Sequence, residues 1–283
     1  MPDTALAAAS KGASLEAMLR YNVFTGVKPV NETFGPNNMT RRVQGKSEEK
    51  PVTLHDGRAV KDELDLEVNG FEFVDHVSKM QNWLDETELK SVYYAECAEL
   101  IKQVSGAYRV HVFDHTLRSG DENERTAKFL REPVLSVHND YTEWSGPQRV
   151  RDLLPSEAEE LLKRRFAIIQ VWRPISTWPV QANPVAIADA RSLDMKDLIA
   201  AERRYPDRVG ETYQIKYNPD HCWYHFPLMR REEALVFKVY ESKKDGRARF
   251  TAHTSFVNPA APSAAPPRQS IEIRTIAFFA EDN

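Results

Sequence analysis

A long series of short strand-like segments in the second half of the chain most constrains its fold. Each segment is rich in β-branched and aromatic residues, and turns separate one segment from the next. The segments are residues 167–172, 185–189, 212–217, 223–226, 234–240, 249–256 and 271–279. Such a series fits a two-sheet jelly roll of the cupin type, a double-stranded β-helix, better than a fold of alternating helices and strands. We therefore predict a mainly β protein with flanking helices.

The first part of the chain predicts an arm and two helices. Residues 1–65 combine an Ala-rich start with turn residues and a Lys- and Glu-rich stretch, which indicates a loosely ordered arm that packs on the body. Residues 66–283 would then form the double-stranded β-helix domain. Apolar residues mostly three to four apart between Val77 and Ile101 predict two helices that lie against a sheet.

Two shorter patterns add a strand and a helical insert. Val110 and Val112 alternate with polar or aromatic neighbours, which predicts a strand with both valines on one face. Ser156 and Glu159 have the spacing of a capping box, in which the first side chain caps a helix N-terminus. A helical insert is therefore expected near residues 145–165.

Length and composition exclude several classes of protein. The chain has 283 residues, 41% of them hydrophobic, which is enough for one large domain with a substantial core. The formal charge of -4 argues against broad nucleic-acid binding, which relies on clustered Lys and Arg. We find neither a stretch long enough to span a bilayer nor a secretion signal, so we expect a cytoplasmic protein that does not bind membranes. The oligomeric state stays open, with a homodimer as one alternative.

Two histidines and one aspartate form a candidate metal site. Side chains two residues apart on a strand share a face, so His138 and Asp140 can converge on one ion while Asn139 points away. His253, on a distant strand, completes one face of an octahedron. The opposite positions stay free for a co-substrate and dioxygen, as an Fe(II) oxygenase requires. The alternative for each histidine is a hydrogen-bonded structural role without metal.

Several motifs occur together in a fixed order along the chain. They are Val110–Thr116, Val137–Thr142, Val171–Pro174, Trp223–Met229 and Pro266–Glu272. In this order they resemble the fungal gibberellin desaturase-like family, which also contains a cephamycin methoxylation component and an endoperoxide-forming meroterpenoid enzyme. The resemblance runs from about Gly70 to the C-terminus and implies Fe(II), 2-oxoglutarate and the same three iron ligands. Asn139, Gln170 and His225 depart from residues common in that family.

The far carboxylate of 2-oxoglutarate needs a cation. Arginine suits this task because its planar fork makes paired hydrogen bonds to a carboxylate. Arg268 and Arg274 follow the last iron ligand and share a strand face with Ser270 and Glu272. Arg268 and Ser270 resemble the Arg-x-Ser clamp of related oxygenases, so they are the first candidate and Arg274 is the second. A salt bridge with Glu272 or Asp282 is the alternative, and we expect it for at least one of the two arginines.

Aromatic and polar residues of the strand-like segments are candidates for lining a substrate cavity. They are Trp172, Arg173, Tyr217, Trp223, Tyr224 and His225, of which we predict Arg173, Tyr217, Trp223 and His225 as substrate contacts. A core position is the alternative for the aromatic residues. For Arg173 the alternative is a structural pair with Asp189 or Glu233, since a buried arginine needs an anionic partner.

The candidate metal site, together with what the family resemblance implies, predicts an Fe(II)- and 2-oxoglutarate-dependent dioxygenase. It would use dioxygen to hydroxylate, desaturate or cyclise a small secondary metabolite. One alternative is a cupin-fold metalloenzyme that does not use 2-oxoglutarate, for which neither Arg268 nor Arg274 should face the metal. Another is a non-catalytic partner subunit of a biosynthetic enzyme. The residues do not distinguish a terpenoid from an amino-acid-derived or alkaloid substrate.

Overall fold

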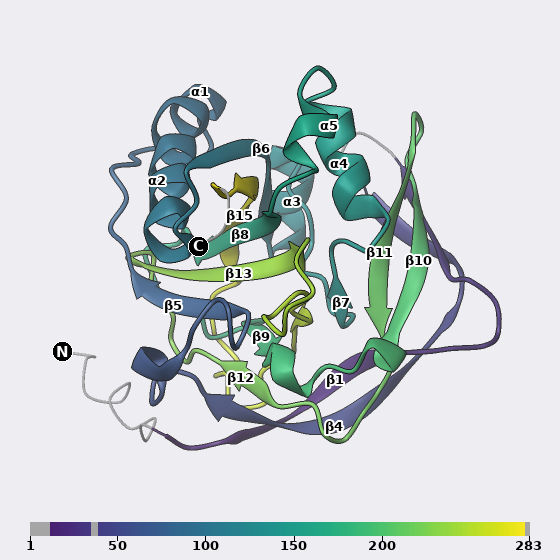
Figure 1. Cartoon of the computed structure of the whole chain (residues 1–283). Coiled ribbons are helices and arrows are strands. Elements are labelled where there is room, and N and C mark those ends of the chain that lie inside the picture. The colour runs from purple at the N-terminus through teal and green to yellow at the C-terminus, as the bar shows by residue number, and fades with distance from the viewer. Residues whose placement is uncertain (1–11, 35–38, 281–283) are drawn as a thin grey trace.

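Two β-sheets enclose the main apolar core of the protein (Figure 1). The computed structural model describes residues 12–34 and 39–280. The smaller sheet has the strand order β5 (Phe71–Asp75), β13 (Glu233–Glu241), β8 (Phe166–Pro174), β15 (Gln269–Phe278) and β6 (Arg109–Ser119). The larger sheet has the order β1 (Leu15–Val23), β4 (Lys46–Asp56), β12 (Trp223–His225), β9 (Val185–Ala188), β14 (His253–Ser255), β7 (His138–Asn139), β11 (Val209–Ile215), β10 (Leu198–Arg204), β2 (Val30–Phe34) and β3 (Met39–Gln44). The predicted mainly β architecture is confirmed.

Every strand-like segment of the second half contains a strand, but two strands of the body were missed. The missed strands are β5 and β10. The apolar run of β8 illustrates why the strong segments were found: this strand is covered on both faces. Ile168 and Trp172 face the core between the sheets, whereas Ile169 and Val171 face a second core beneath α2 (Tyr94–Ser105). Burial on both faces demands a nearly continuous apolar sequence.

One continuous helical segment covers the outer face of the five-stranded sheet, where two helices were expected. It comprises α1 (Glu86–Glu88), the π-helical turn η3 (Leu89–Tyr93) and α2, which packs on β6 and β15. The prediction of helix from Val77 onward was wrong. The backbone N–H groups of Gln81 and Asn82 donate to the carboxylate of Glu88 instead of to helical carbonyl oxygens. The helix begins only after Asp85, whose side chain caps it.

The loosely ordered arm expected for residues 1–65 was wrong for the part that the structure describes. Residues 15–23 and 46–56 form β1 and β4. β1 pairs with β4 along its whole length, and the end of β4 pairs with β12, which joins both strands to the ten-stranded sheet. Apolar side chains of β1, including Leu19 and Tyr21, are buried in the main core. Residues 1–11 lie outside the described residues, and the domain division near residue 65 stays a prediction.

Short helices occupy the predicted insert and the loops. The insert carries α4 (Ser145–Leu153) and α5 (Ala158–Leu161). The predicted capping box is not formed, because Glu157 is the N-cap of α5 and makes no side-chain cap hydrogen bond. The remaining elements are α3 (Glu122–Lys128), η2 (Lys61–Glu63), η4 (Ala190–Ser192) and η5 (Met195–Asp197). Across residues 12–34 and 39–280, no helix has both the length and the apolar composition of a bilayer span.

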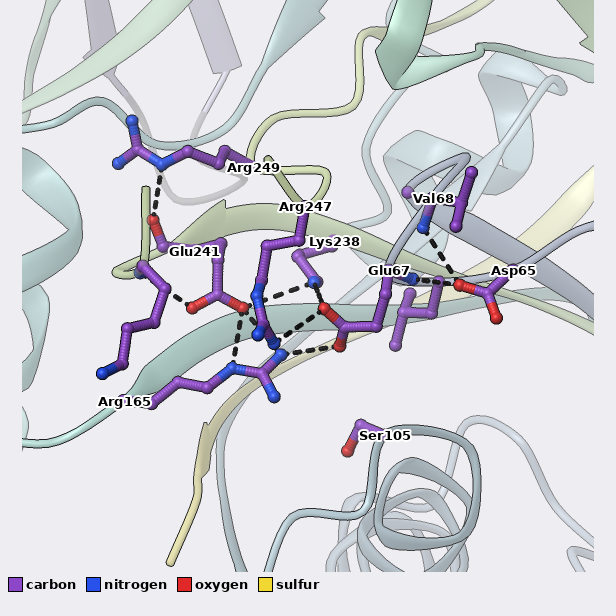
Figure 2. Close-up of polar contacts among 12 residues, drawn as sticks. Asp65, Glu67, Val68, Ser105, Arg165, Lys238, Glu241, Arg247 and Arg249 are labelled. Atoms are coloured by element: carbon purple, nitrogen blue, oxygen red, sulfur yellow. Dashed lines mark hydrogen bonds and ion pairs between the residues drawn. The ribbon is translucent and has the colours of Figure 1, made fainter. Parts of the chain in front are cut away.

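A buried ion cluster ties the start of the body to the five-stranded sheet (Figure 2). It consists of Glu67, Arg165, Lys238, Glu241 and Arg247. The side chains of Lys238 and Glu241 are fully buried and 3.3 Å apart. Glu67 accepts from three cations, at 2.6 Å from Arg165, 2.8 Å from Lys238 and 3.1 Å from Arg247. The cluster therefore joins the loop before β5 to β8, β13 and the loop after β13.

The substitution Glu241→Gln should destabilise the protein strongly. It leaves the fully buried ammonium group of Lys238 with less negative charge beside it, and breaking a buried pair in this way costs about 3–5 kcal/mol. The free energy of unfolding from urea denaturation measures the loss. Glu160→Gln is the matched control, because Glu160 is 79% exposed in its pair with Lys163 and such pairs contribute about 0–1 kcal/mol. Equal losses in the two variants would contradict the role of the cluster.

Candidate active site

His138 and His253 face each other across two adjacent strands. They form the antiparallel pair that joins β7 to β14, and residues directly opposite each other in such a pair point to the same side of the sheet. Their ring centroids lie 4.4 Å apart. Asp140 follows β7 directly, with its Oδ1 3.4 Å from Nε2 of His138. One ligand atom from each of these three residues lies within 4.8 Å of the others, so the structure brings the predicted triad together.

Backbone carbonyl groups orient both imidazole rings. Nδ1 of His138 lies 2.8 Å from the carbonyl oxygen of Ser136, and Nδ1 of His253 lies 3.1 Å from that of Thr251. A carbonyl oxygen only accepts hydrogen bonds, so each Nδ1 carries a proton, and Nε2 is the ring nitrogen left to bind a metal. Burial, and then the electrostatic effect of the neighbouring His138, lowers the pKa of His253 to about 4, so the His253 ring is neutral at pH 7. Neutral imidazoles with a fixed tautomer are the form that binds metal.

The carboxylate of Asp140 is ionised and held through its other oxygen. Burial acts to raise its pKa, but the hydrogen bond with His138 and the charge of Arg274 outweigh burial and keep the pKa well below its usual range. Oδ2 accepts from Nε2 of Gln170 at 2.7 Å and from Nε of Arg274 at 3.4 Å. Because Oδ2 is engaged, Oδ1 is left to face the two imidazoles. Two neutral nitrogens and one carboxylate oxygen with an open side fit a ferrous ion.

Asn139 fixes the short strand that carries these ligands. Its side chain is fully buried and points away from the triad, as predicted. Oδ1 accepts from the backbone N–H of Thr251 at 3.1 Å, while Nδ2 donates to the carbonyl oxygens of Val239 at 2.9 Å and Tyr141 at 2.7 Å. The amide therefore connects β7 to β13 and to the segment that leads into β14.

A cavity opens beside the triad, and Arg268 lies in its wall. The lining residues are Arg118, Val134, His138, Trp172, Val185, Phe237, His253, Thr254, Ser255, Arg268 and Glu272. The guanidinium of Arg268 is buried and donates to the carbonyl oxygen of Asn183 and to the hydroxyl of Ser255, but it makes no ion pair with a described carboxylate. Its Nε and the hydroxyl of Ser270 are buried without any hydrogen-bond partner. Two unpartnered polar groups of this kind suit a bound carboxylate.

Arg274, the second candidate for that carboxylate, is already occupied by protein groups. Its guanidinium donates to Glu272, to the hydroxyl of Thr116 at 2.8 Å and to Asp114 at 3.4 Å, besides Asp140. The expected salt bridge of one arginine with Glu272 is thus present, whereas Asp282 lies outside the described residues. Burial acts to lower the pKa of Arg274, but Glu272, Asp114 and Asp140 raise it well above its usual value. Arg274 therefore holds the carboxylate of Asp140 in place and does not offer a free guanidinium for 2-oxoglutarate.

The fold and the site have counterparts in known proteins. Residues 19–278 match the family model described as an oxidoreductase/YMDC permease-like domain. The chain is 30% identical to the hydroxylase/desaturase efuI of Hormonema carpetanum, over 81% of this chain and 84% of that protein. It is 32% identical to the Fe(II)/2-oxoglutarate-dependent dioxygenase nvfI of Aspergillus novofumigatus, over 80% of this chain and 82% of that protein. The chain belongs to this oxidoreductase family.

A solved structure supports the same assignment. The iron and alpha-ketoglutarate-dependent endoperoxidase NvfI superposes with a TM-score of 0.82 and 26% identity, covering 95% of this chain and 99% of that chain. The chain thus shares the jelly-roll fold of this oxygenase, and the predicted double-stranded β-helix is confirmed. The resemblance to a family of hydroxylase/desaturase enzymes is confirmed as well.

In this family member, Arg173 does not line the cavity, contrary to the prediction. Its side chain is fully buried on the face of β8 that packs against the helical segment, because it alternates with Trp172, which does line the cavity. The guanidinium donates to the backbone carbonyl oxygens of His76 at 2.9 Å and Arg231 at 3.3 Å, and lies over the ring of Tyr93. The alternative pairs with Asp189 or Glu233 are also wrong, since those acids bind Arg191 and Arg58.

The other three predicted substrate contacts are not among the lining residues either. Trp223 is fully buried and donates its Nε1 to the hydroxyl of Tyr21 at 2.7 Å, and Tyr217 packs edge-on against the same Tyr21 ring. His225 packs edge-on against Phe256. Trp223 and His225 of β12, and Tyr217 just after β11, therefore pack on aromatic rings of other segments, so their aromatic character reflects the core.

Two charged residues of the cavity were missed as site residues. Arg118 lies on β6, beyond the end of the strand predicted around Val110, and Glu272 was considered only as a salt-bridge partner. Register explains why Arg118 was missed: Arg274 pairs with Asp114 but Thr275 pairs with Val112, so β6 contains a bulge. A bulge reverses the alternation of side chains. Val112 and Arg118 are an even number of residues apart, yet Val112 faces the helical segment and Arg118 faces the cavity.

The substitution Gln170→Ala should weaken metal binding. It removes the 2.7 Å hydrogen bond to Asp140, and loss of such a partner of a ligand typically costs 10–100-fold in metal affinity, so we expect a decrease of about that size. Anaerobic titration with Co(II), followed by its visible absorption, measures the dissociation constant. Gln148→Ala is the control, because Gln148 makes an equivalent bond to Asp152 on the exposed surface of α4. Unchanged affinity in Gln170→Ala would rule out its positioning role.

Proposed function

We propose that this protein binds Fe(II) through His138, Asp140 and His253, holds 2-oxoglutarate through Arg268 and Ser270, and uses dioxygen to oxidise a small secondary metabolite. As a member of its family it is an Fe(II)- and 2-oxoglutarate-dependent oxidoreductase. The observation that carries the proposal is that the unpaired guanidinium of Arg268 lines the same cavity as both histidines of the triad.

The protein groups would divide the work as follows. Bound Fe(II) would supply the activation of dioxygen and the oxidation of the substrate. The three ligands occupy one side of the ion and leave the other side open. Gln170 and Arg274 hold the second oxygen of Asp140, and Arg268 with Ser270 would hold the far carboxylate of 2-oxoglutarate. Phe237, packed against the ring of His253, would keep water from that side.

The position of the arginines argues against the metalloenzyme that does not use 2-oxoglutarate. That alternative requires that neither arginine faces the metal site. Arg268 instead lines the cavity, and Arg274 contacts Asp140. An anion-binding group would have no function in a site that takes no anionic co-substrate.

The substrate class follows from the family, and the individual reaction stays open. Relatives carry names that include hydroxylase/desaturase, dioxygenase and endoperoxidase. We therefore propose hydroxylation, desaturation or oxidative ring closure of a small molecule. Cytoplasmic residence and a homodimer stay predictions of the sequence.

Anaerobic addition of Fe(II) and 2-oxoglutarate tests the proposal. The chelate formed by the keto and carboxylate oxygens on the ion should give a weak charge-transfer band in the visible. His138→Ala and Asp140→Ala should both abolish this band and the release of succinate in air, because each removes one of three ligands. His55→Ala is the matched control, since His55 is exposed on β4.

Two results would contradict the proposal. Absence of the band in the unaltered protein would refute binding of 2-oxoglutarate to the metal. A band without succinate release, even when candidate substrates are supplied, would favour the non-catalytic partner subunit.

A further inference from the structure

Arg118 is a second guanidinium in the wall of the cavity, besides Arg268. It lies on β6 directly opposite Ser270 of β15, so the two side chains point to the same side of the sheet. It lines the cavity together with Arg268 and both histidines of the triad. The proposed co-substrate clamp explains Arg268 and Ser270 but leaves Arg118 without a role.

The described part of the chain offers Arg118 no acidic partner of its own. Among the described residues, its guanidinium makes one hydrogen bond, from Nη1 to the backbone carbonyl oxygen of Glu132 at 2.8 Å. Glu272 is the carboxylate of the cavity, and it is bound by Arg274. The guanidinium of Arg118 therefore keeps donor groups for which no residue in 12–34 or 39–280 supplies a charged acceptor.

The charges at this end of the cavity do not balance. Burial, then the repulsion of Arg118, lowers the pKa of Arg268 to about 9, and Glu272 only partly opposes this. Burial also lowers the pKa of Arg118 to about 10 against the attraction of Glu272, with Arg274 adding repulsion. Two cations that disfavour each other beside two unpartnered polar atoms indicate a site built for an anion.

The register shows which end of the co-substrate Arg118 would meet. Arg274 lies opposite Asp114 and Gln170, at the level of the triad, whereas Arg118 lies opposite Ser270. Four residues along β15 separate the two levels, roughly 13 Å at about 3.3 Å per residue. The Arg118 level is therefore the one remote from the metal ligands.

We propose that Arg118 binds the far carboxylate of 2-oxoglutarate together with Arg268 and Ser270. The carboxylate would then lie between the guanidinium of Arg118 on β6 and that of Arg268 directly before β15, with the hydroxyl of Ser270 as a third donor. This inference rests on the proposed function, because it requires 2-oxoglutarate in the cavity.

A comparison of two ligands with two proteins tests this contact. The ligands are 2-oxoglutarate and 2-oxopentanoate, which has the same chain length but no far carboxylate. Isothermal titration calorimetry of the full-length Mn(II)-loaded protein measures both affinities without turnover. Arg118→Gln should weaken 2-oxoglutarate about 10- to 100-fold, as for loss of a charged hydrogen bond, and should change 2-oxopentanoate less than about 3-fold. Arg268→Gln should show the same selective loss.

A variant of Arg109 is the control, and separate outcomes would contradict the inference and the proposed function. Arg109→Gln, on the same strand but in a surface pair with Glu157, should leave both affinities unchanged. Arg118→Lys keeps the charge without the planar fork, so it should show a smaller loss for 2-oxoglutarate alone and covers the case in which the glutamine variant does not fold. Unchanged 2-oxoglutarate affinity in both Arg118 variants, or equal losses for the two ligands, would overturn the inference. Failure of the unaltered protein to bind 2-oxoglutarate would instead overturn the proposed function.

Discussion

The cross-strand pair of His138 and His253 is the contact on which the rest of the site depends. β7 has two residues, and a slip of one residue would turn the ligand face of the strand away from the cavity. So short a strand has few backbone hydrogen bonds with which to hold its register. The buried amide of Asn139 supplies the missing ones, since its donors and acceptor bind the backbone on both sides. The residue that differs from the family pattern thus supports the ligands from the opposite face.

Alternation along β15 separates two electrostatic tasks on one face of one strand. Near the triad, Arg274 is surrounded by Glu272, Asp114 and Asp140, so positive and negative charges compensate and the carboxylate of Asp140 is held ionised. Directly before the strand, Arg268 meets no described carboxylate, and its positive charge is left uncompensated. Arg268 and Arg274 are an even number of residues apart in an extended segment, so both side chains point to the cavity side of the sheet. The same protein segment therefore holds the carboxylate of Asp140 ionised and leaves a buried guanidinium without a carboxylate partner among the described residues.

Strand periodicity could predict the fold and the convergence of the triad, but it could not predict the wall of the cavity. The candidates Trp172 and Arg173 are neighbours on one strand, so only one of them can face the cavity, and sequence alone does not say which face is inside when both are covered. The bulge in β6 reverses the alternation of side chains that begins at Val110, so the pattern at Val110 and Val112 did not predict that Arg118 faces the cavity. Trp223 and His225 lie outside the cavity lining for another reason: aromatic residues in a strand pack in the core more often than they contact a ligand.

The N-terminal strands β1 and β4 support the site, but their polar residues did not predict strands. β1 carries alternating apolar residues, among them Leu19 and Tyr21, but its exposed face and the charged β4 suggested a loose arm. The backbone N–H of Val137 donates to the carbonyl oxygen of Arg20, and the side chain of Asn22 donates to the carbonyl oxygen of Val137. These bonds hold the residue directly before His138. The N-terminal segment, which we expected to be a loose arm on the body, therefore helps to position His138, the first candidate metal ligand.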